Sequence, residues 1–312
     1  MAERIGVLLM AYGTPAGPDD VERYYTHIRR GRPPTPELLA DLQRRYQAIG
    51  GISPLLEITR AQAAGLQAAL DQAHADRFRV VLGMKHASPF IEEGVAELAA
   101  AGVDRAVGLV LAPHLSALSG SEYVRRARAA ADEVAAGMEL TFVEQWHDAP
   151  GYLDFLADAV TDALARLDNA GVAGPHVLFT AHSLPARLLA TDDPHPGQVE
   201  ETAAAVAARA RIERWSVAWQ SAGRTEEEWL GPDGRDVIRE LATDDGVTGV
   251  VVCPAGFVAD HLEVLYDVDV ECRQVAEEAG LAFARTAAPN ADPAFVATLA
   301  DVVLRHLATA PA

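Results

Sequence analysis

Cysteine and lysine are scarce in this chain of 312 residues. It has two cysteines, Cys253 and Cys272, and its only lysine is Lys85. Two thiols cannot form a disulfide framework or a four-thiolate metal cluster. We therefore expect a protein of a reducing compartment.

Long apolar runs are absent as well. No apolar stretch approaches the ~18–20 residues that a membrane span needs. The first four residues, Met1-Ala2-Glu3-Arg4, lead straight into an apolar strand-like stretch, with no signal-peptide core or cleavage site. These features favour a cytoplasmic protein without an integral membrane segment, and a hydrophobic content of 50% is enough for a large core.

Positive charge is limited, because 26 Lys and Arg face 45 Asp and Glu, a net charge of −19. This balance argues against nucleic acid and anionic membrane surfaces as partners, since both are bound by basic surfaces. The charge is also unevenly distributed. Residues 226–280 hold fifteen acids and three arginines, whereas residues 21–46 hold six arginines and three acids. The first region could attract a cation and the second an anion.

Short β-branched runs alternate with Ala-, Leu- and Glu-rich helical stretches, a pattern typical of an α/β protein with parallel sheets. Four expected strands precede residue 150 and four follow it, and Ala149-Pro150-Gly151 punctuates the middle. We therefore expect two lobes, residues 1–150 and 151–290, with the C-terminal helix, 291–312, packing back on the first. The expected strands are 5–11, 79–84, 106–112, 140–145, 177–181, 216–219, 250–253 and 282–285.

Polar residues follow several of these strands at the edge where open α/β sheets bind ligands. They include Tyr12, Lys85-His86, His182-Ser183 and Gln220-Ser221. No G-x-G-x-x-G or Walker motif follows any strand, which argues against dinucleotide and nucleotide triphosphate chemistry.

Glu263, Asp267 and Glu271 recur every four residues, which would place them on one face of an α-helix. A solvated acidic face is one interpretation. The other is a ladder of oxygen ligands that delivers a divalent cation. The position after a strand-end turn adds weight to the second interpretation and leaves both open.

His182 directly follows the apolar run 177–181. A lone histidine is often structural, but this one ends a strand where a ligand site is expected. An imidazole can act as a base or bind a borderline metal such as Fe²⁺. Together with Glu263 it would supply one nitrogen and one oxygen ligand.

The region 21–46 combines its arginines with tyrosines, and Gly50-Gly51-Ile52-Ser53-Pro54 follows it. It could be a solvated helix face. It could also bind a polycarboxylate or phosphate, because guanidinium groups pair bidentately with such anions.

Seven segments of the chain resemble the ferrochelatases, in particular the soluble bacterial type that acts on coproporphyrin III. AHSLP and GFVADHLE are the most specific of them, and together the segments span almost the whole chain. They are MAYGTP (10–15), YYTHIRRGR (24–32), YQAIGGISPL (46–55), LAPH (111–114), AHSLP (181–185), WLGP (229–232) and GFVADHLE (256–263).

The resemblance implies two Rossmann-like lobes of the chelatase type, each with a four-stranded parallel sheet flanked by helices, and a porphyrin cleft between them. It implies a lyase of haem biosynthesis that inserts Fe²⁺ into coproporphyrin III and releases two protons. His182 and Glu263 match the catalytic and metal-binding residues, and Asp267 and Glu271 match the acidic face that could deliver the metal. Tyr12 matches an axial iron ligand, and the positions that match porphyrin contacts are Tyr12, Arg29, Arg45, Tyr46, Ser53 and Tyr123.

The resemblance also implies that no organic cofactor takes part, that Fe²⁺ is a substrate, and that the enzyme transiently contacts neighbouring enzymes of haem synthesis. Some relatives carry an iron–sulfur cluster or a membrane-anchoring extension, and we expect neither here. One departure follows AHSLP, where similar sequences have Gly-Asp-Pro-Tyr and this chain has Asp192-Asp193-Pro194-His195.

Other functions remain open at the level of sequence. A protoporphyrin IX ferrochelatase would share the same motifs. A cobalt or nickel chelatase acting on sirohydrochlorin would share the fold without the AHSLP and GFVADHLE pair. A non-catalytic porphyrin carrier would bind the macrocycle without turnover.

Overall fold

A computed structural model describes residues 4–117, 120–134 and 137–309 of the chain. The chain divides into two compact units. Unit 1 comprises Met1–Trp146 and Asn290–Ala312, and unit 2 comprises His147–Pro289. None of the helices described is both long and apolar enough to cross a membrane.

Unit 1 is built on a parallel sheet in the order β2-β1-β3-β4. All seven residues of β1 are buried, as expected for a strand that helices cover on both faces. The strands are β1 (Ile5–Ala11), β2 (Phe78–Met84), β3 (Arg105–Val110) and β4 (Glu139–Val143).

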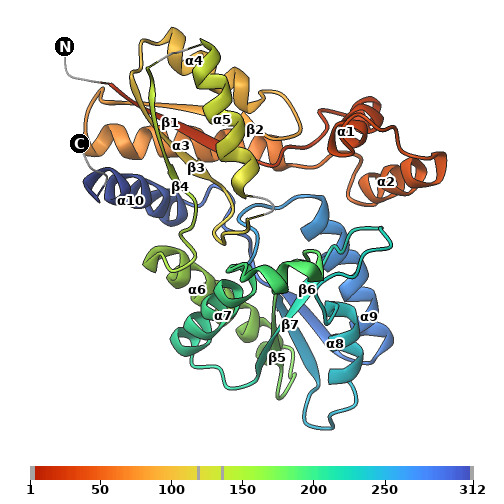
Figure 1. Ribbon diagram of the computed structural model, residues 1–312. Coiled ribbons are helices and arrows are strands. Elements are labelled where there is room, and N and C mark those ends of the chain that lie inside the picture. Colours follow the sequence, from red (N-terminus) through yellow and green to blue (C-terminus); the bar gives the residue numbers. More distant parts are fainter. Residues whose placement is uncertain (1–3, 118–119, 135–136, 310–312) are drawn as a thin grey trace. The chain divides into compact units, whose positions relative to one another are not determined.

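Helices cover both faces of this sheet (Figure 1). Leu8 and Met10 pack with apolar residues of α4 and α5 in one core cluster. On the other face α3 and α10 lie side by side, and α1 and α2 extend away from the sheet (Figure 1). The helical segments are η1 (Pro18–Asp20), α1 (Val21–Ile28), α2 (Pro36–Ala48), α3 (Leu55–Ala73), α4 (Ile91–Ala100), α5 (Gly120–Val134) and α10 (Pro293–Thr309).

The first part of unit 1 ends at Trp146. The indole of this residue donates to the carbonyl oxygen of Val110 at 2.9 Å and packs against Phe295 of α10, with ring centres 6.0 Å apart. The contact with Phe295 joins the two stretches of chain that form unit 1. Residues 310–312 of the expected C-terminal helix lie outside the described residues.

Unit 2 repeats the arrangement with a parallel sheet in the order β6-β5-β7-β8. Its strands are β5 (His176–His182), β6 (Trp215–Gln220), β7 (Gly249–Cys253) and β8 (Ala282–Arg285). Its helical segments are α6 (Pro150–Asn169), η2 (Ala186–Thr191), α7 (His195–Ala210), α8 (Gly234–Leu241), η3 (Glu263–Cys272) and α9 (Arg273–Glu278).

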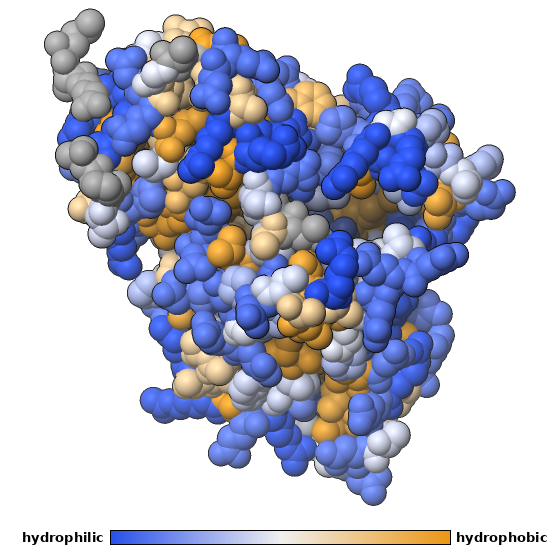
Figure 2. Space-filling view, viewed as in Figure 1, coloured by the Kyte–Doolittle hydropathy of each residue, from blue (hydrophilic) through white to orange (hydrophobic). Residues whose placement is uncertain are grey.

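All eight predicted strands are confirmed, and β1 and β8 have the predicted bounds. The prediction succeeded because most of these strands are continuous apolar runs bounded by polar or turn residues. The surface in the view of Figure 2 is mostly hydrophilic, with apolar patches between the hydrophilic residues. Both cysteines are buried as free thiols.

Gly256 is required where the turn after β7 crosses β5. Its N–H donates to the carbonyl oxygen of Thr180 at 3.0 Å. A Cβ atom at Gly256 would lie 2.6 Å from the Cβ of Ala181, the residue before His182. The absence of a side chain thus lets the segment that carries Glu263 lie against the end of β5.

We predict that Gly256→Ala destabilises the protein by ~1–3 kcal/mol, the usual cost of overpacking. The measurement is the urea unfolding midpoint. The matched control is Gly197→Ala in α7, where an added Cβ meets no atom within 4 Å and alanine favours the helix by ~0.5–1 kcal/mol. An unchanged midpoint for Gly256→Ala would contradict the prediction.

Candidate active site

His182 ends β5 after five buried residues. Its Nδ1 hydrogen-bonds to the carbonyl oxygen of Ser183. Since a carbonyl oxygen can only accept, Nδ1 carries the proton. Nε2 is therefore the nitrogen that can bind a metal when the ring is neutral.

Glu263 lies at the start of η3, with its carboxylate between two imidazoles. Its Oε1 lies 3.5 Å from Nε2 of His182, and its Oε2 lies 3.5 Å from Nε2 of His261. His261 Nδ1 donates to the carbonyl oxygen of Ala259 at 2.9 Å, so both imidazoles present Nε2 to the same carboxylate. Sequence reasoning placed His182 and Glu263 together but did not select His261, although it stands two residues before Glu263 in GFVADHLE.

The electrostatic environment of this cluster favours the charged forms of His182 and Glu263. Burial lowers the pKa of His182, but the Glu263 carboxylate outweighs burial and raises it to about 9. Burial raises the pKa of Glu263, and the two imidazoles outweigh that effect and hold it well below its usual range. The side chains of His182 and Glu263 remain 37% and 33% exposed, so a ligand can reach them.

The acidic ladder differs from its prediction, because Glu263–Cys272 is a π-helix rather than an α-helix. A π-helix bonds residue i to i+5, so residues four apart lie slightly less than one turn apart, and Glu263, Asp267 and Glu271 can still share one face. Only the predicted helix type is wrong, and the role of the three carboxylates stays a prediction. π-Helical turns are rare and occur frequently at functional sites.

The two later carboxylates of the ladder have polar partners from other elements. Asp267 is buried and accepts a hydrogen bond from the Ser221 hydroxyl. Glu271 pairs with Arg235 of α8 at 3.0 Å. Buried or half-buried carboxylates need such partners, and sequence spacing within one helix could not reveal them.

The end of β6 supports the cluster. Gln220 pairs in register with His182, and its Nε2 donates to the main-chain oxygen of Glu263 at 3.0 Å. Its Oε1 accepts from Thr180 at 2.6 Å. Ser221, which donates to Asp267, has a left-handed φ of 59°. Such backbone conformations persist only where the surrounding structure holds them in place, and they cluster at active sites.

The ligand count of this cluster is small. Within residues 4–117, 120–134 and 137–309, no group of three or more His, Cys, Asp or Glu side chains is arranged to hold a metal ion. The two side chains that the sequence predicts as metal ligands are neighbours, with His182 Nε2 and Glu263 Oε1 3.5 Å apart.

The predicted porphyrin contacts belong to unit 1. Tyr12 follows β1 and is 43% exposed, whereas Tyr46, Ser53 and Tyr123 are buried. The Tyr46 hydroxyl lies 3.4 Å from Oγ1 of Thr14, so the segments YQAIGGISPL and MAYGTP meet. The structure therefore brings together segments that are far apart in the sequence.

The two predicted arginines lie near the ends of α1 and α2. Arg29 follows α1, and its Nε is buried without a hydrogen-bond partner. Arg45 lies in the last turn of α2, and its Nε is 3.3 Å from Oδ2 of Asp41. The buried Nε–H of Arg29 is a donor that an anion could satisfy.

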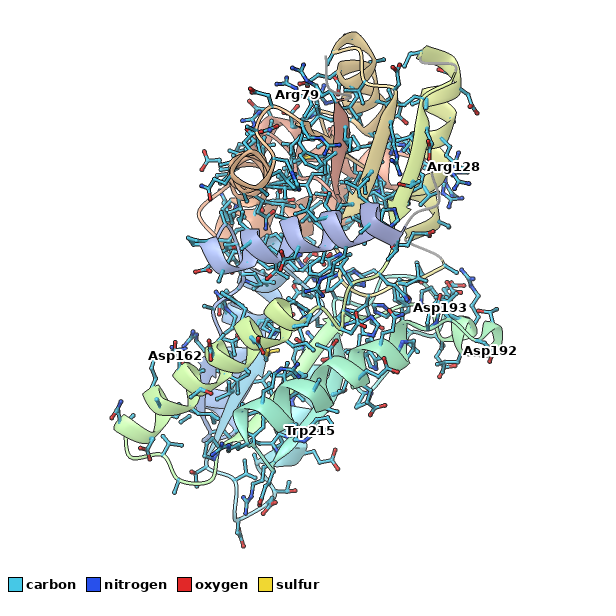
Figure 3. The ribbon with its side chains drawn as sticks, turned by 90° about the vertical axis from the view of Figure 1, so that its left-hand side faces the viewer. Arg79, Arg128, Asp162, Asp192, Asp193 and Trp215 are labelled. Atoms are coloured by element: carbon cyan, nitrogen blue, oxygen red, sulfur yellow. The ribbon has the colours of Figure 1, made fainter. Side chains whose placement is uncertain are left out.

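The segment 192–195, which departs from the family pattern, leads into α7. Asp192 adopts a left-handed conformation, and the imidazole of His195 packs 5.7 Å from the ring of Trp219. In unit 2, Asp192 and Asp193 lie at the opposite end from Trp215, the first residue of β6 (Figure 3). The segment thus lies toward the carboxyl ends of the strands.

Comparison with known proteins gives consistent matches over almost the whole chain. A family model described as Ferrochelatase matches residues 4–307. A coproporphyrin III ferrochelatase of Bacillus pumilus is 47% identical over 98% of both chains, and one of Geobacillus sp. is 46% identical over 98% of both. The crystal structure of a sirohydrochlorin chelatase from Bacillus subtilis subspecies spizizenii with cobalt matches 99% of this chain and 97% of its own. Its TM-score is 0.58 at 11% identity, a likeness that concerns the fold alone.

We predict that His182 of the metal-free protein titrates near pH 9, and that Glu263→Gln lowers this pKa, because burial is then opposed by fewer groups that favour the charged ring. The pKa of His182 in the folded protein lies above its unfolded value of ~6.5, so protonation of His182 stabilises the folded state. This stabilisation is complete below pH 6.5 and is lost as the pH rises through 9. NMR titration of the histidine ring protons measures both values.

The control for this titration is Glu227→Gln, which removes a carboxylate that pairs with Arg187 instead. It should leave the titration of His182 unchanged. A His182 pKa that is the same in Glu263→Gln and in the unaltered protein would contradict the prediction.

Proposed function

The chain belongs to the ferrochelatase family, and from this premise we propose that it inserts Fe²⁺ into coproporphyrin III, releases two protons and so makes Fe-coproporphyrin III for haem biosynthesis. This is a lyase reaction. The observation that carries the proposal is the cluster in which Glu263 lies between His182 and His261, at the position where the sequence predicts the metal site.

The chemical obstacle is the flat macrocycle, whose nitrogens lie in plane and still carry two protons. Binding that bends the porphyrin exposes nitrogen lone pairs, so binding energy lowers the barrier to metal entry. Imidazole nitrogen and carboxylate oxygen both suit Fe²⁺. We assign His182 Nε2 and Glu263 as the protein ligands of the incoming iron.

His182 must lose its Nε2 proton before it can bind iron, because only the neutral ring has a free lone pair there. That proton leaves to solvent, because Glu263 must stay ionised to bind the same iron. The same two groups can then receive a pyrrole proton once the metal has left for the macrocycle. In this scheme iron binding and proton release are coupled.

Unit 1 provides the residues that we assign to the porphyrin. Arg29 and Arg45 would pair with propionate groups, and Arg29 has a buried Nε–H that lacks a partner in the free protein. The remaining residues that we assign to the macrocycle are Tyr12, Tyr46, Ser53 and Tyr123. Tyr12 is also assigned as an axial ligand of the iron.

Coproporphyrin III carries four propionates and protoporphyrin IX carries two, so the first needs more cationic partners. The net positive charge of residues 21–46 supports this choice, as do the names of the relatives. We further propose that the protein acts in the cytoplasm and has no resident cofactor. It would make transient contact with neighbouring enzymes of haem synthesis.

We predict that the purified protein, under anaerobic conditions, metallates coproporphyrin III with Fe²⁺ faster than protoporphyrin IX, as followed by the absorbance change. His182→Ala should reduce kcat at least about a hundredfold, the usual contribution of a positioned acid–base group. Equal rates on both porphyrins would contradict the substrate assignment. Porphyrin binding without turnover would favour a carrier.

We assign Asp267 and Glu271 to metal delivery, with their partners Ser221 and Arg235 holding them in place. We predict that the double variant Asp267→Asn, Glu271→Gln raises KM for Fe²⁺ about tenfold or more, because two charge-assisted contacts to the cation are lost. KM for the porphyrin should stay constant.

The steady-state rate as a function of Fe²⁺ concentration is the measurement for this variant. The control is Asp236→Asn, which removes an exposed carboxylate of α8 that pairs with Arg239. Unaltered metal affinity and turnover in the double variant would remove both residues from the proposal.

A further inference from the structure

Lys85, the only lysine in the chain, is a buried residue of unit 1 with no role in the proposed reaction so far. It directly follows β2, and its side chain is only 7% exposed. Lysine is almost never buried this far unless it is paired. Its surroundings therefore bear on what it does.

Three side chains surround the Lys85 ammonium. Nζ lies 2.9 Å from Oε2 of Glu122, 5.2 Å from the ring centre of Tyr123 and 5.8 Å from the ring centre of Tyr12. Both ring distances fall within the ~6 Å range of cation–π attraction. One cation thus contacts the two tyrosines that the proposed function assigns to the porphyrin.

The main chain of Lys85 is held as firmly as its side chain. Its N–H donates to the carbonyl oxygen of Ala11 at 2.9 Å, and its own carbonyl oxygen accepts from Arg126. Arg126 in turn makes two hydrogen bonds to Glu92, at 2.7 and 2.6 Å. Lys85 is therefore held both at its main chain and at its ammonium group.

Tyr12 is the more exposed of the two tyrosines, and packing fixes it less than it fixes the buried Tyr123. The imidazole of His86 packs on its ring, with centres 4.6 Å apart. The Tyr12 ring thus has contacts to His86 and to the Lys85 cation. An aromatic ring held by two such contacts retains a defined orientation.

We propose that Lys85 is a positioning residue for metal insertion: its ammonium, held by Glu122, orients Tyr12 and Tyr123 toward porphyrin and iron. This rests on the proposed function, in which Tyr12 binds the iron axially. Lysine suits the task because its compact charge fits between two rings, where the larger planar guanidinium of arginine would need more space.

The experiment uses Lys85→Met, Glu122→Gln and the double variant Lys85→Met, Glu122→Gln. Ferric coproporphyrin III is added to each, and phenolate-to-iron charge transfer in the absorption and resonance Raman spectra reports ligation by Tyr12. Both variants without the lysine should weaken this signature and lower kcat/KM for coproporphyrin III about ten- to thirtyfold, as expected for loss of a desolvated cation–π contact. Glu122→Gln keeps the cation and should largely keep the signature.

The double variant decides between positioning and mere charge balance. It leaves no unpaired carboxylate, so it carries the test even where Lys85→Met alone does not fold. If it restores the spectrum and kcat/KM of the unaltered protein, Lys85 only neutralises Glu122 and the proposal is overturned.

Two controls complete the design. Arg79→Met with Glu97→Gln makes the same chemical change at an exposed ion pair of unit 1 and should change neither readout. Tyr12→Phe should abolish the phenolate signature. A phenolate signature that persists in Tyr12→Phe would refute the axial ligation in the proposed function. A phenolate signature that is lost in Tyr12→Phe but stays intact in both variants without the lysine would refute the role of Lys85.

Discussion

Parallel pairing of strands is the constraint on which the candidate site depends. In a parallel sheet the carboxyl ends of neighbouring strands meet at one edge, so residues far apart in sequence become neighbours there. In unit 2 the register of β5 with β6 sets His182 beside Gln220. Gln220 then bonds to the main chain of Glu263, and the turn after β7 reaches β5 through Gly256.

Charge compensation is the second organising feature of unit 2. Its acidic helices would repel one another if their carboxylates were free, yet partners come from other elements. Arg235 of α8 pairs with Glu271, and Arg285 of β8 pairs with both Asp260 and Asp269. Glu263 is different, because its partners are imidazoles, which can exchange a proton for a metal. This difference separates the candidate metal site from the surrounding ion pairs.

Much of the fold was predictable because its strands are buried on both faces. Such strands read as continuous apolar runs with clear ends, and all eight were placed to within a few residues. The main error was the type of helix that carries the acidic ladder. Spacing of four residues is compatible with an α-helix, and the sequence carries no signal that Glu263–Cys272 becomes a π-helix. His261 was missed for another reason, since its role depends on a contact with Glu263 across a turn.

The amino-acid sequence by itself determined the α/β class, the strand positions, the scarcity of thiols and lysine, and the motifs that carry the family. These properties are local, because each depends on residue type, apolar runs and short spacings. Only the tertiary structure decided that Glu263 faces two imidazoles, that Asp267 and Glu271 are paired, and that Lys85 lies between Tyr12 and Tyr123. The physical reason is that each of these contacts depends on the distance in space between two side chains. Folding brings those side chains together from positions that can be tens of residues apart in the sequence.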